Sequence, residues 1–171
     1  MIAHLHIRAI NPFSVKGFLD LRGLRFPCLL GHKGRSFIKC EGDGKSPKGK
    51  WRLLNLYYRP DRLGRFNCAL AMTAMKASDG WCDDKSHGRY NQKVHLPFQG
   101  SHELMWRSDE AYDLVVTTSH NQRPRVKGAG SAIFLHLWRE GAQGTQGCIA
   151  LRPKDLRRLL TLLPAKSYLV I

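Results

Sequence analysis

The chain has 171 residues, of which 43% are hydrophobic, so it is long enough and apolar enough to form a globular domain. Its 28 lysines and arginines outnumber its 13 acidic residues, which gives a formal net charge of +15. These values exclude a disordered chain, and no stretch approaches the roughly 20 apolar residues that span a bilayer. A surface this basic attracts polyanions, so a nucleic acid, an anionic membrane face and an acidic cell-wall polymer are all open as partners.

The predicted elements begin with a series of short strands. We expect five strands in the first part of the chain, at residues 4–8, 17–22, 24–30, 36–40 and 51–58. The second and third of these are joined at Gly23 like a hairpin. Residues 41–50 contain Gly, Pro, Asp and Ser at almost every second position and are therefore expected to form a loop.

The N-terminus alternates between apolar and polar residues and lacks the apolar core of a secretory signal. Either the protein stays in the cytoplasm, or its leader has been removed, or its export is unconventional.

In the second part of the chain we expect four strands, with one helix before the last of them. Residues 59–110 read as irregular, and four strands are then expected at residues 112–118, 131–138, 147–151 and 167–171. Residues 153–163 carry leucines at helical spacing, and Pro153 suits a first turn. Many short strands and one late helix favour a single mainly β domain over residues 1–171, built as a sandwich or a partly open barrel.

The basic residues and the cysteines each form no recognisable motif. The basic residues make no run of five or more, and the sequence has no helix-turn-helix, zinc-finger or RNA-recognition signature, so we expect no specific nucleic-acid partner. The number of cysteines is odd and no C-x-x-C pair occurs among them. At least one thiol must therefore be free. Cys28 lies in an apolar run and is interpreted as a buried small hydrophobe.

The most informative pair is His136, on an apolar strand-like run, and Cys148, between Gly147 and the start of the next such run. Two short strands joined by a loop can bring these side chains together. Imidazole must reach the sulfur to deprotonate it, so this placement suits a cysteine nucleophile. The alternative is a buried core thiol and a histidine that is merely packed on a strand.

Residues 145–149, Thr-Gln-Gly-Cys-Ile, preceded by the strand histidine, resemble the active-site motif of the L,D-transpeptidase (YkuD-like) family. That motif is a histidine on a strand, a loop, and then Ser/Thr-His-Gly-Cys followed by an apolar residue. Residues 46–49, Ser-Pro-Lys-Gly, resemble a second landmark of the family, a Thr/Ser-Pro-x-Gly loop that leads into an apolar strand. The resemblance covers residue 34 to the C-terminus.

Three positions differ from the family pattern. Gln146 replaces the usual histidine before Gly-Cys, Leu137 stands where a small residue is common, and Ala150 stands where arginine is usual. The loop between His136 and Cys148 is also shorter than usual. The bond that is attacked is therefore left open.

The resemblance implies that Cys148 is the nucleophile and His136 is its base. It implies an oxyanion hole built from the backbone N–H groups of Gln146, Gly147 and Cys148, and Gly147 allows the close approach of a substrate carbonyl. The group that holds the histidine ring is open between a side chain and a backbone carbonyl.

Further side chains are expected to border the substrate. Those predicted to contact it are Thr145, Lys45, Trp81, Asp83, Tyr90, Asn91 and His102. Glu103 and His102 are interpreted either as groups that orient an acceptor amine or as caps of a helix that starts near Ser101. The scattered cysteines and histidines have no metal-ligand spacing, so no metal and no organic cofactor is expected.

The resemblance implies peptidoglycan stem peptides as donor and acceptor and a periplasmic or cell-envelope location. The reaction would capture the donor as a thioester and pass it to an acceptor amine, which forms a cross-link. Two alternatives are a hydrolase of peptidoglycan or of a lipoprotein linkage, and a non-catalytic basic module that binds wall polymer or nucleic acid. The oligomeric state is open.

Overall fold

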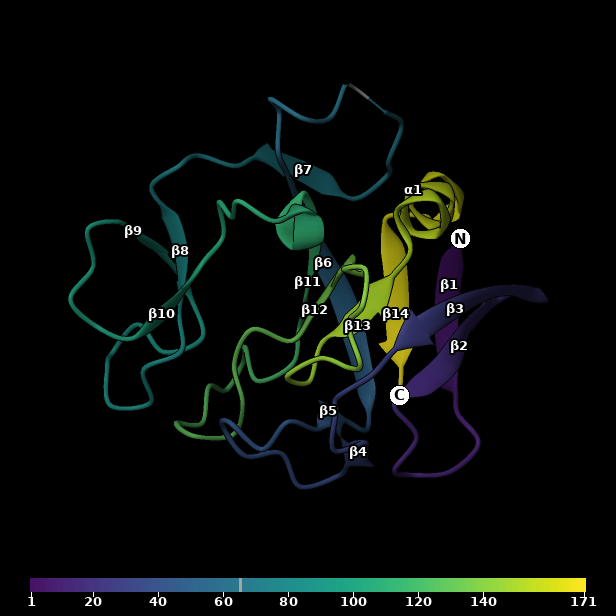
Figure 1. Ribbon diagram of the computed structural model, residues 1–171, viewed down its shortest axis with the longest axis horizontal. Helices are drawn as coiled ribbons and strands as arrows, with labels where there is room; N and C mark the ends of the chain where they lie inside the picture. The colour runs from purple at the N-terminus through teal and green to yellow at the C-terminus, as the bar shows by residue number, and fades with distance from the viewer. Residues whose placement is uncertain (65) are drawn as a thin grey trace.

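The largest feature of the structure is a sheet that closes on itself (Figure 1). The computed structural model describes residues 1–64 and 66–171. In their order around the ring, the strands are β11 (Leu114–Thr118), β12 (Phe134–Leu137), β13 (Ile149–Leu151), β3 (Leu24–Leu29), β2 (Lys16–Leu21), β1 (Ile2–Arg8), β14 (Lys166–Val170) and β6 (Lys50–Tyr58). Because β6 also pairs with β11, the ring is complete and the structure is a barrel. The ninth strand of this sheet, β7 (Ala71–Ala74), extends from β6 outside the ring.

The barrel is mixed, and its local turns follow the sequence. Strands β1 and β14 are parallel, as are β12 and β13, whereas β2 and β3 form an antiparallel hairpin. Arg22 and Gly23 connect that hairpin with φ angles of 51° and 85°. Positive φ at both turn residues matches the twist of the flanking strands, which explains why a glycine stands there. The hairpin predicted at Gly23 and the mainly β class are confirmed.

Outside the barrel the structure has several short strands and one 3-10 helix, which differ from the predicted elements. They are β4 (Arg35–Ser36), β5 (Ser46–Pro47), β8 (Asp79–Cys82), β9 (Lys93–His95), β10 (His102–Leu104) and the 3-10 helix η1 (Glu110–Tyr112). A helix starting near Ser101, one of the two interpretations of Glu103 and His102, does not form, because that segment pairs with β8 as a strand. The strand expected at residues 36–40 is shorter than predicted, and its apolar residues Phe37 and Ile38 are 80% and 81% exposed.

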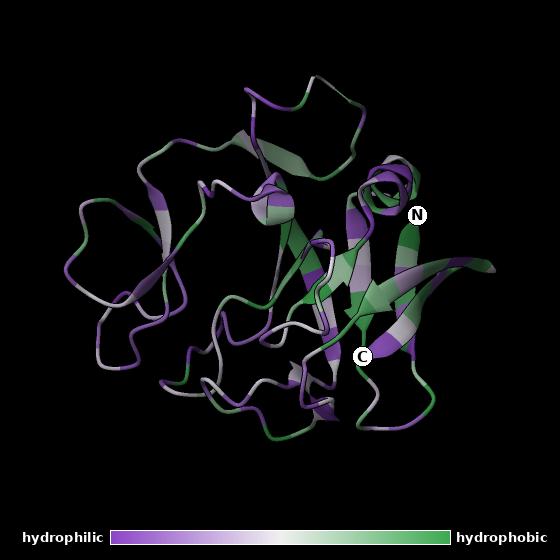
Figure 2. Cartoon of the chain, in the orientation of Figure 1, coloured by the Kyte–Doolittle hydropathy of each residue, from purple (hydrophilic) through white to green (hydrophobic). Residues whose placement is uncertain are grey.

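Alternation along the barrel strands separates an inner core from an outer face. Leu135 and Leu137 of β12 and Ile149 and Leu151 of β13 point into the main core cluster. The helix α1 (Pro153–Leu162) adds Leu156, Leu159 and Leu160 to the same cluster. Figure 2 shows the hydrophobic residues concentrated in the barrel strands and the hydrophilic ones along many connecting loops. Successive side chains of a strand point to opposite faces, so His136 and Cys148 share the outer face.

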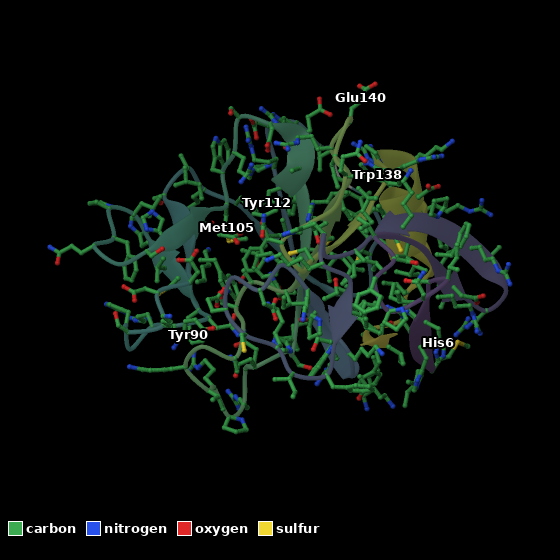
Figure 3. All side chains as sticks on the ribbon, turned by 60° about the horizontal axis from the view of Figure 1, so that its bottom comes forward. His6, Tyr90, Met105, Tyr112, Trp138 and Glu140 are labelled. Atoms are coloured by element: carbon green, nitrogen blue, oxygen red, sulfur yellow. The ribbon has the colours of Figure 1, made fainter. Side chains whose placement is uncertain are left out.

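A second apolar cluster covers this outer face. Phe134 and Cys148 pack there with Trp81, Met105 and Tyr112. Figure 3 shows Met105 and Tyr112 close together in the interior of the molecule. The segment between β7 and β11 therefore forms a wall beside the end of β12.

Among the residues that the structure describes, no helix has the length and apolar character needed to cross a bilayer.

Candidate active site

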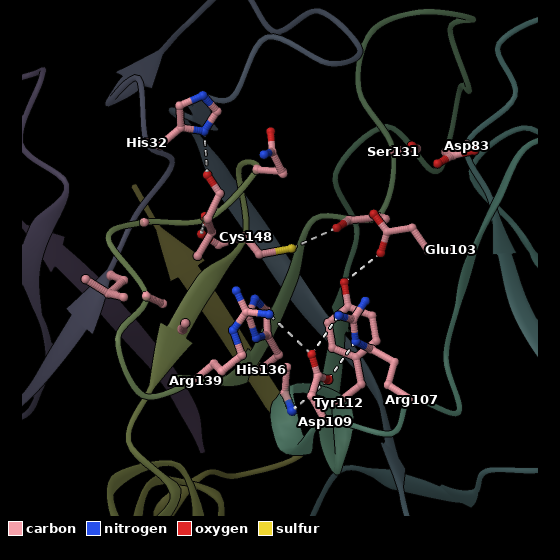
Figure 4. Close-up of a pocket in the computed structure, with 18 of the residues that line it drawn as sticks. His32, Asp83, Glu103, Arg107, Asp109, Tyr112, Ser131, His136, Arg139 and Cys148 are labelled. Atoms are coloured by element: carbon pink, nitrogen blue, oxygen red, sulfur yellow. Dashed lines mark hydrogen bonds and ion pairs between the residues drawn. The ribbon is translucent and has the colours of Figure 1, made fainter.

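A cleft of about 650 Å³ opens on the outer face of β12 and β13 (Figure 4). Both Cys148 and His136 line it, so the structure brings the predicted nucleophile and base into one site. The register places His136 beside Ala150, two residues beyond Cys148 on the neighbouring parallel strand. The two side chains are therefore diagonal neighbours on one face of the sheet.

The Cys148 thiol is held by backbone groups of the segment just before His136 in the chain. Its Sγ donates to the carbonyl oxygen of Ala132 at 3.0 Å and accepts from the Phe134 N–H at 3.4 Å. Ala132 has a φ of 50°, a conformation that side-chain-bearing residues rarely adopt. This backbone arrangement points a carbonyl at the sulfur and stores conformational strain beside it.

The acid–base properties of the pair are set mainly by burial. Burial raises the pKa of the Cys148 thiol to about 12, and the nearby carboxyl of Glu103 adds to the effect. Burial lowers the pKa of His136 to about 4. At neutral pH the resting pair is therefore a thiol and a neutral imidazole. Deprotonation must accompany attack on the substrate.

A backbone carbonyl holds the His136 ring. Nδ1 lies 2.9 Å from the carbonyl oxygen of Leu137. A carbonyl only accepts hydrogen bonds, so Nδ1 carries the proton and Nε2 keeps its lone pair. The Tyr112 ring meets the imidazole edge-on, with ring centroids 5.3 Å apart. The choice between a side chain and a carbonyl is thus resolved in favour of the carbonyl.

The turn before Cys148 is held by Thr145. Its Oγ1 donates to the Cys148 carbonyl at 2.6 Å and accepts from the Gly147 N–H at 3.1 Å. Gly147 has a φ of 132°, and a Cβ there would lie 2.7 Å from the Lys45 carbonyl oxygen, so only glycine fits. Because its N–H is already bonded, Gly147 does not supply an oxyanion donor in this structure. Gln146 and Cys148 keep that proposed role.

The Ser-Pro loop lies directly behind this turn. The hydroxyl of Ser46 is fully buried, accepts from the Gly31 N–H at 2.9 Å and donates to the Cys148 carbonyl at 3.5 Å. The two sequence landmarks, far apart in the chain, therefore contact one another at the nucleophile.

The predicted substrate contacts divide into two groups. Thr145 and Asp83 line the cleft, as does Gln146 from the predicted oxyanion hole. The other five, which do not line it, are Lys45, Trp81, Tyr90, Asn91 and His102. Trp81 is buried against Phe134, Tyr90 donates to Glu41 at 2.5 Å, and His102 bonds the Gly100 carbonyl at 2.8 Å. In this structure Trp81, Tyr90 and His102 thus contact other parts of the protein.

Asn91 illustrates this structural role. Its side chain is 2% exposed, and its Oδ1 accepts from Trp81 Nε1 at 3.0 Å and from the Ala132 N–H at 3.1 Å. The amide nitrogen donates to the carbonyls of His120 and Asn121. Asn91 therefore fixes the backbone that holds the Cys148 thiol.

We expect Asn91→Gly to lower the free energy of unfolding by about 2–4 kcal/mol, because buried polar partners lose their hydrogen bonds. Glycine keeps the left-handed backbone, for which φ is 55°, so the substitution adds no backbone strain to the loss of the side chain. Urea denaturation measures it, with the exposed Asn11→Gly as control. An Asn91→Gly protein of unchanged stability that fails to bind donor would instead indicate direct substrate contact.

Several lining residues were not predicted from the sequence. Arg107 binds Asp109 through two nitrogens at 2.8 and 2.7 Å, and Arg139 lies 3.5 Å from the same carboxylate. Asp109 also caps η1, which places Tyr112 beside His136. These ion pairs keep the pKa of Asp109 down at about 2. The sequence offers one signal for these lining residues, the helix-capping pattern Ser108-Asp109-Glu110. That pattern predicts a helix start but not that the residues lie near Cys148.

No group of three or more His, Cys, Asp or Glu side chains within residues 1–64 and 66–171 is placed to hold a metal ion. The structure describes all five cysteines as free thiols.

Comparison with known proteins gives a family match and two structural likenesses. The family model of the L,D-transpeptidase catalytic domain (YkuD) matches residues 20–171. The crystal structure of Mycobacterium tuberculosis L,D-transpeptidase 1 is 12% identical with a TM-score of 0.40, covering 99% of this chain and 60% of its own. An L,D-transpeptidase from Mycobacterium smegmatis is 11% identical with a TM-score of 0.41, covering 99% of this chain and 57% of its own.

No curated protein matched the sequence. The present chain spans about three fifths of each mycobacterial chain. The family match extends over most of the sequence and includes both cleft strands. The chain belongs to the L,D-transpeptidase catalytic-domain (YkuD) family, a family of cysteine L,D-transpeptidases.

Proposed function

We propose that the protein is a peptidoglycan L,D-transpeptidase that captures a donor stem peptide on Cys148 and passes it to an acceptor amine. The observation that carries the proposal is that Cys148 and His136 line the same cleft, with Nδ1 of the ring held by the Leu137 carbonyl. A neutral imidazole with an unprotonated Nε2 is the form that accepts a thiol proton. Family membership supports this substrate class.

In the first half-reaction, the Cys148 sulfur attacks a carbonyl carbon of the donor stem as its proton passes to His136. The oxyanion that forms would be stabilised by the backbone N–H groups of Gln146 and Cys148. The peptide C–N bond then breaks, and the departing amine takes the proton from His136. The products are a thioester on Cys148 and the released C-terminal part of the stem.

In the second half-reaction, a neutral acceptor amine attacks the thioester carbonyl. The nitrogen gives a proton to His136, which returns it to the departing sulfur. A C–N bond forms, the C–S bond breaks, and Cys148 is again a thiol. Water in place of the amine would give a shortened stem, which is the hydrolase alternative.

The surface charge is consistent with a wall substrate. A net charge of +15 favours association with an acidic glycan–peptide mesh. We propose the cell envelope as the site of action, as is typical of the family.

The test is incubation with purified stem peptides followed by mass spectrometry of the products. We expect cross-linked dimers, and their fragment masses identify the stem bond that is attacked. Shortened monomers without dimers would replace the transferase by a hydrolase. No change in the peptides, combined with salt-sensitive binding to DNA, would favour a basic binding module.

A further inference from the structure

One end of the cleft is acidic although the chain as a whole is strongly basic. Glu41, Asp83 and Glu103 line the cleft together with Cys148. Figure 4 shows Asp83 and Glu103 on the same side of the Cys148 thiol, with Ser131 beside Asp83. Three carboxylates close together are costly unless a cation offsets their repulsion.

Two polar atoms at this end lack a hydrogen-bond partner among the residues that the structure describes. They are the hydroxyl oxygen of Ser131 and Oδ1 of Asp83, and both are buried. Ser131 is only 7% exposed and lines the cleft. A buried polar atom without a partner destabilises the protein, so these two atoms indicate a ligand that forms hydrogen bonds with them.

Glu103 is held toward the nucleophile by Tyr112. The buried Tyr112 hydroxyl donates to Oε2 of Glu103 at 2.6 Å. Burial and the neighbouring carboxylates of Asp83 and Glu41 raise the pKa of Glu103, while the Tyr112 hydrogen bond and the positive charge of Arg107 oppose the shift. Besides burial, the Glu103 carboxyl helps to raise the pKa of the Cys148 thiol. A carboxylate with a raised pKa is a stronger base.

We propose that Glu103, Asp83 and Ser131 form the acceptor site, which binds a primary ammonium group, and that Glu103 removes its proton. The proposal rests on the proposed thioester chemistry of Cys148. An ammonium group has three hydrogens to donate, which matches two carboxylates and one hydroxyl. A cation here also offsets the clustered negative charge.

The proton transfers balance as follows. The acceptor enters as R–NH₃⁺ and gives one proton to the Glu103 carboxylate, which leaves R–NH₂. This amine attacks the thioester, and its second proton passes through His136 to the departing sulfur. An amide bond forms, the C–S bond breaks, and Glu103 later releases its proton to solvent.

The test separates acylation from transfer with the variant Glu103→Gln. Intact mass spectrometry follows formation of the acyl-enzyme from a donor stem peptide and its resolution by either of two nucleophiles. One is a stem peptide with a free side-chain amine, and the other is hydroxylamine, which is largely unprotonated at pH 7. We expect acylation and hydroxylamine resolution near the wild-type rate, and amine transfer reduced by about 10²-fold or more. The exposed Glu110→Gln is the matched control.

Asp83→Asn gives a second, independent variant if Glu103→Gln does not fold. We expect it to raise the KM for the amine acceptor about tenfold with acylation unchanged, because one charged hydrogen bond to the ammonium is weakened. Amine transfer within threefold of wild type in both variants would overturn the acceptor site and leave the thioester chemistry standing. Equal loss of acylation and transfer would also overturn it, since that marks a structural role. Absence of any acyl-enzyme in the wild-type protein would overturn the proposed function and the acceptor site together.

Discussion

Replacing Cys148 with alanine is expected to abolish both the acyl-enzyme and every product made from stem peptides. The sulfur is the only proposed nucleophile, and an alanine leaves nothing to form the thioester. The substitution removes one buried atom and its two weak hydrogen bonds, to the Ala132 carbonyl and from the Phe134 N–H. The fold should therefore survive. Product formation is measured by mass spectrometry, and folding by thermal denaturation.

The matched control is Cys40→Ala, which removes an exposed free thiol outside the cleft. We expect this variant to retain wild-type activity. Product formation by a folded Cys148→Ala protein would exclude this residue as the nucleophile.

His136→Ala is expected to lower the rate of acylation by about 10²–10⁴-fold, since positioned general bases contribute rate factors of this order. Free imidazole added to the variant should restore part of the rate by occupying the vacated space. The exposed His6→Ala is the control. It removes a histidine from β1, a strand that three others separate from β12 in the ring. A variant that keeps more than a third of the wild-type acylation rate would contradict the assignment of the base.

The pH profile of wild-type acylation tests the same residue. The base is competent when it is neutral, that is, above its pKa, and burial lowers the pKa of His136 to about 4. Acylation is therefore expected to persist from pH 7 to about pH 5 and to fall as the pH approaches that pKa. An ordinary histidine, with a pKa near ~6.5, would already lose most of its activity at pH 5. An acid limb at pH 6–7 would contradict the buried, neutral base.

The positions of His136 and Cys148 on one face were predictable, because side chains alternate between the two faces of a strand over a few residues. The apolar run that ends in His136 and the glycine before Cys148 place both side chains opposite the buried residues of β12 and β13. The hairpin at Gly23 and the leucine spacing of α1 were predictable for the same reason, because these signals lie within a few residues of each other.

The wall of the cleft was not predictable, because it depends on long-range pairing. Glu103 faces the cleft because β10 pairs with β8 in a register that sets it opposite Trp81. Residues 59–110 lack a regular hydrophobic period, so the sequence indicated neither the strand nor its register. The same segment includes the helix start considered near Ser101, which the structure replaces with a strand, and the substrate contacts predicted at Trp81 and Asn91, which do not line the cleft. Conformation at these positions is determined by the packing of the second cluster.

The most direct test of the account is to locate the covalent adduct in the wild-type protein. The protein is mixed with donor stem peptide, quenched in acid to preserve a thioester, digested and mapped by mass spectrometry. We predict one added mass, equal to the donor without its leaving group, on the peptide that contains Cys148. Quantitative turnover of the donor with no adduct on that peptide, or with the adduct on another cysteine, would contradict it.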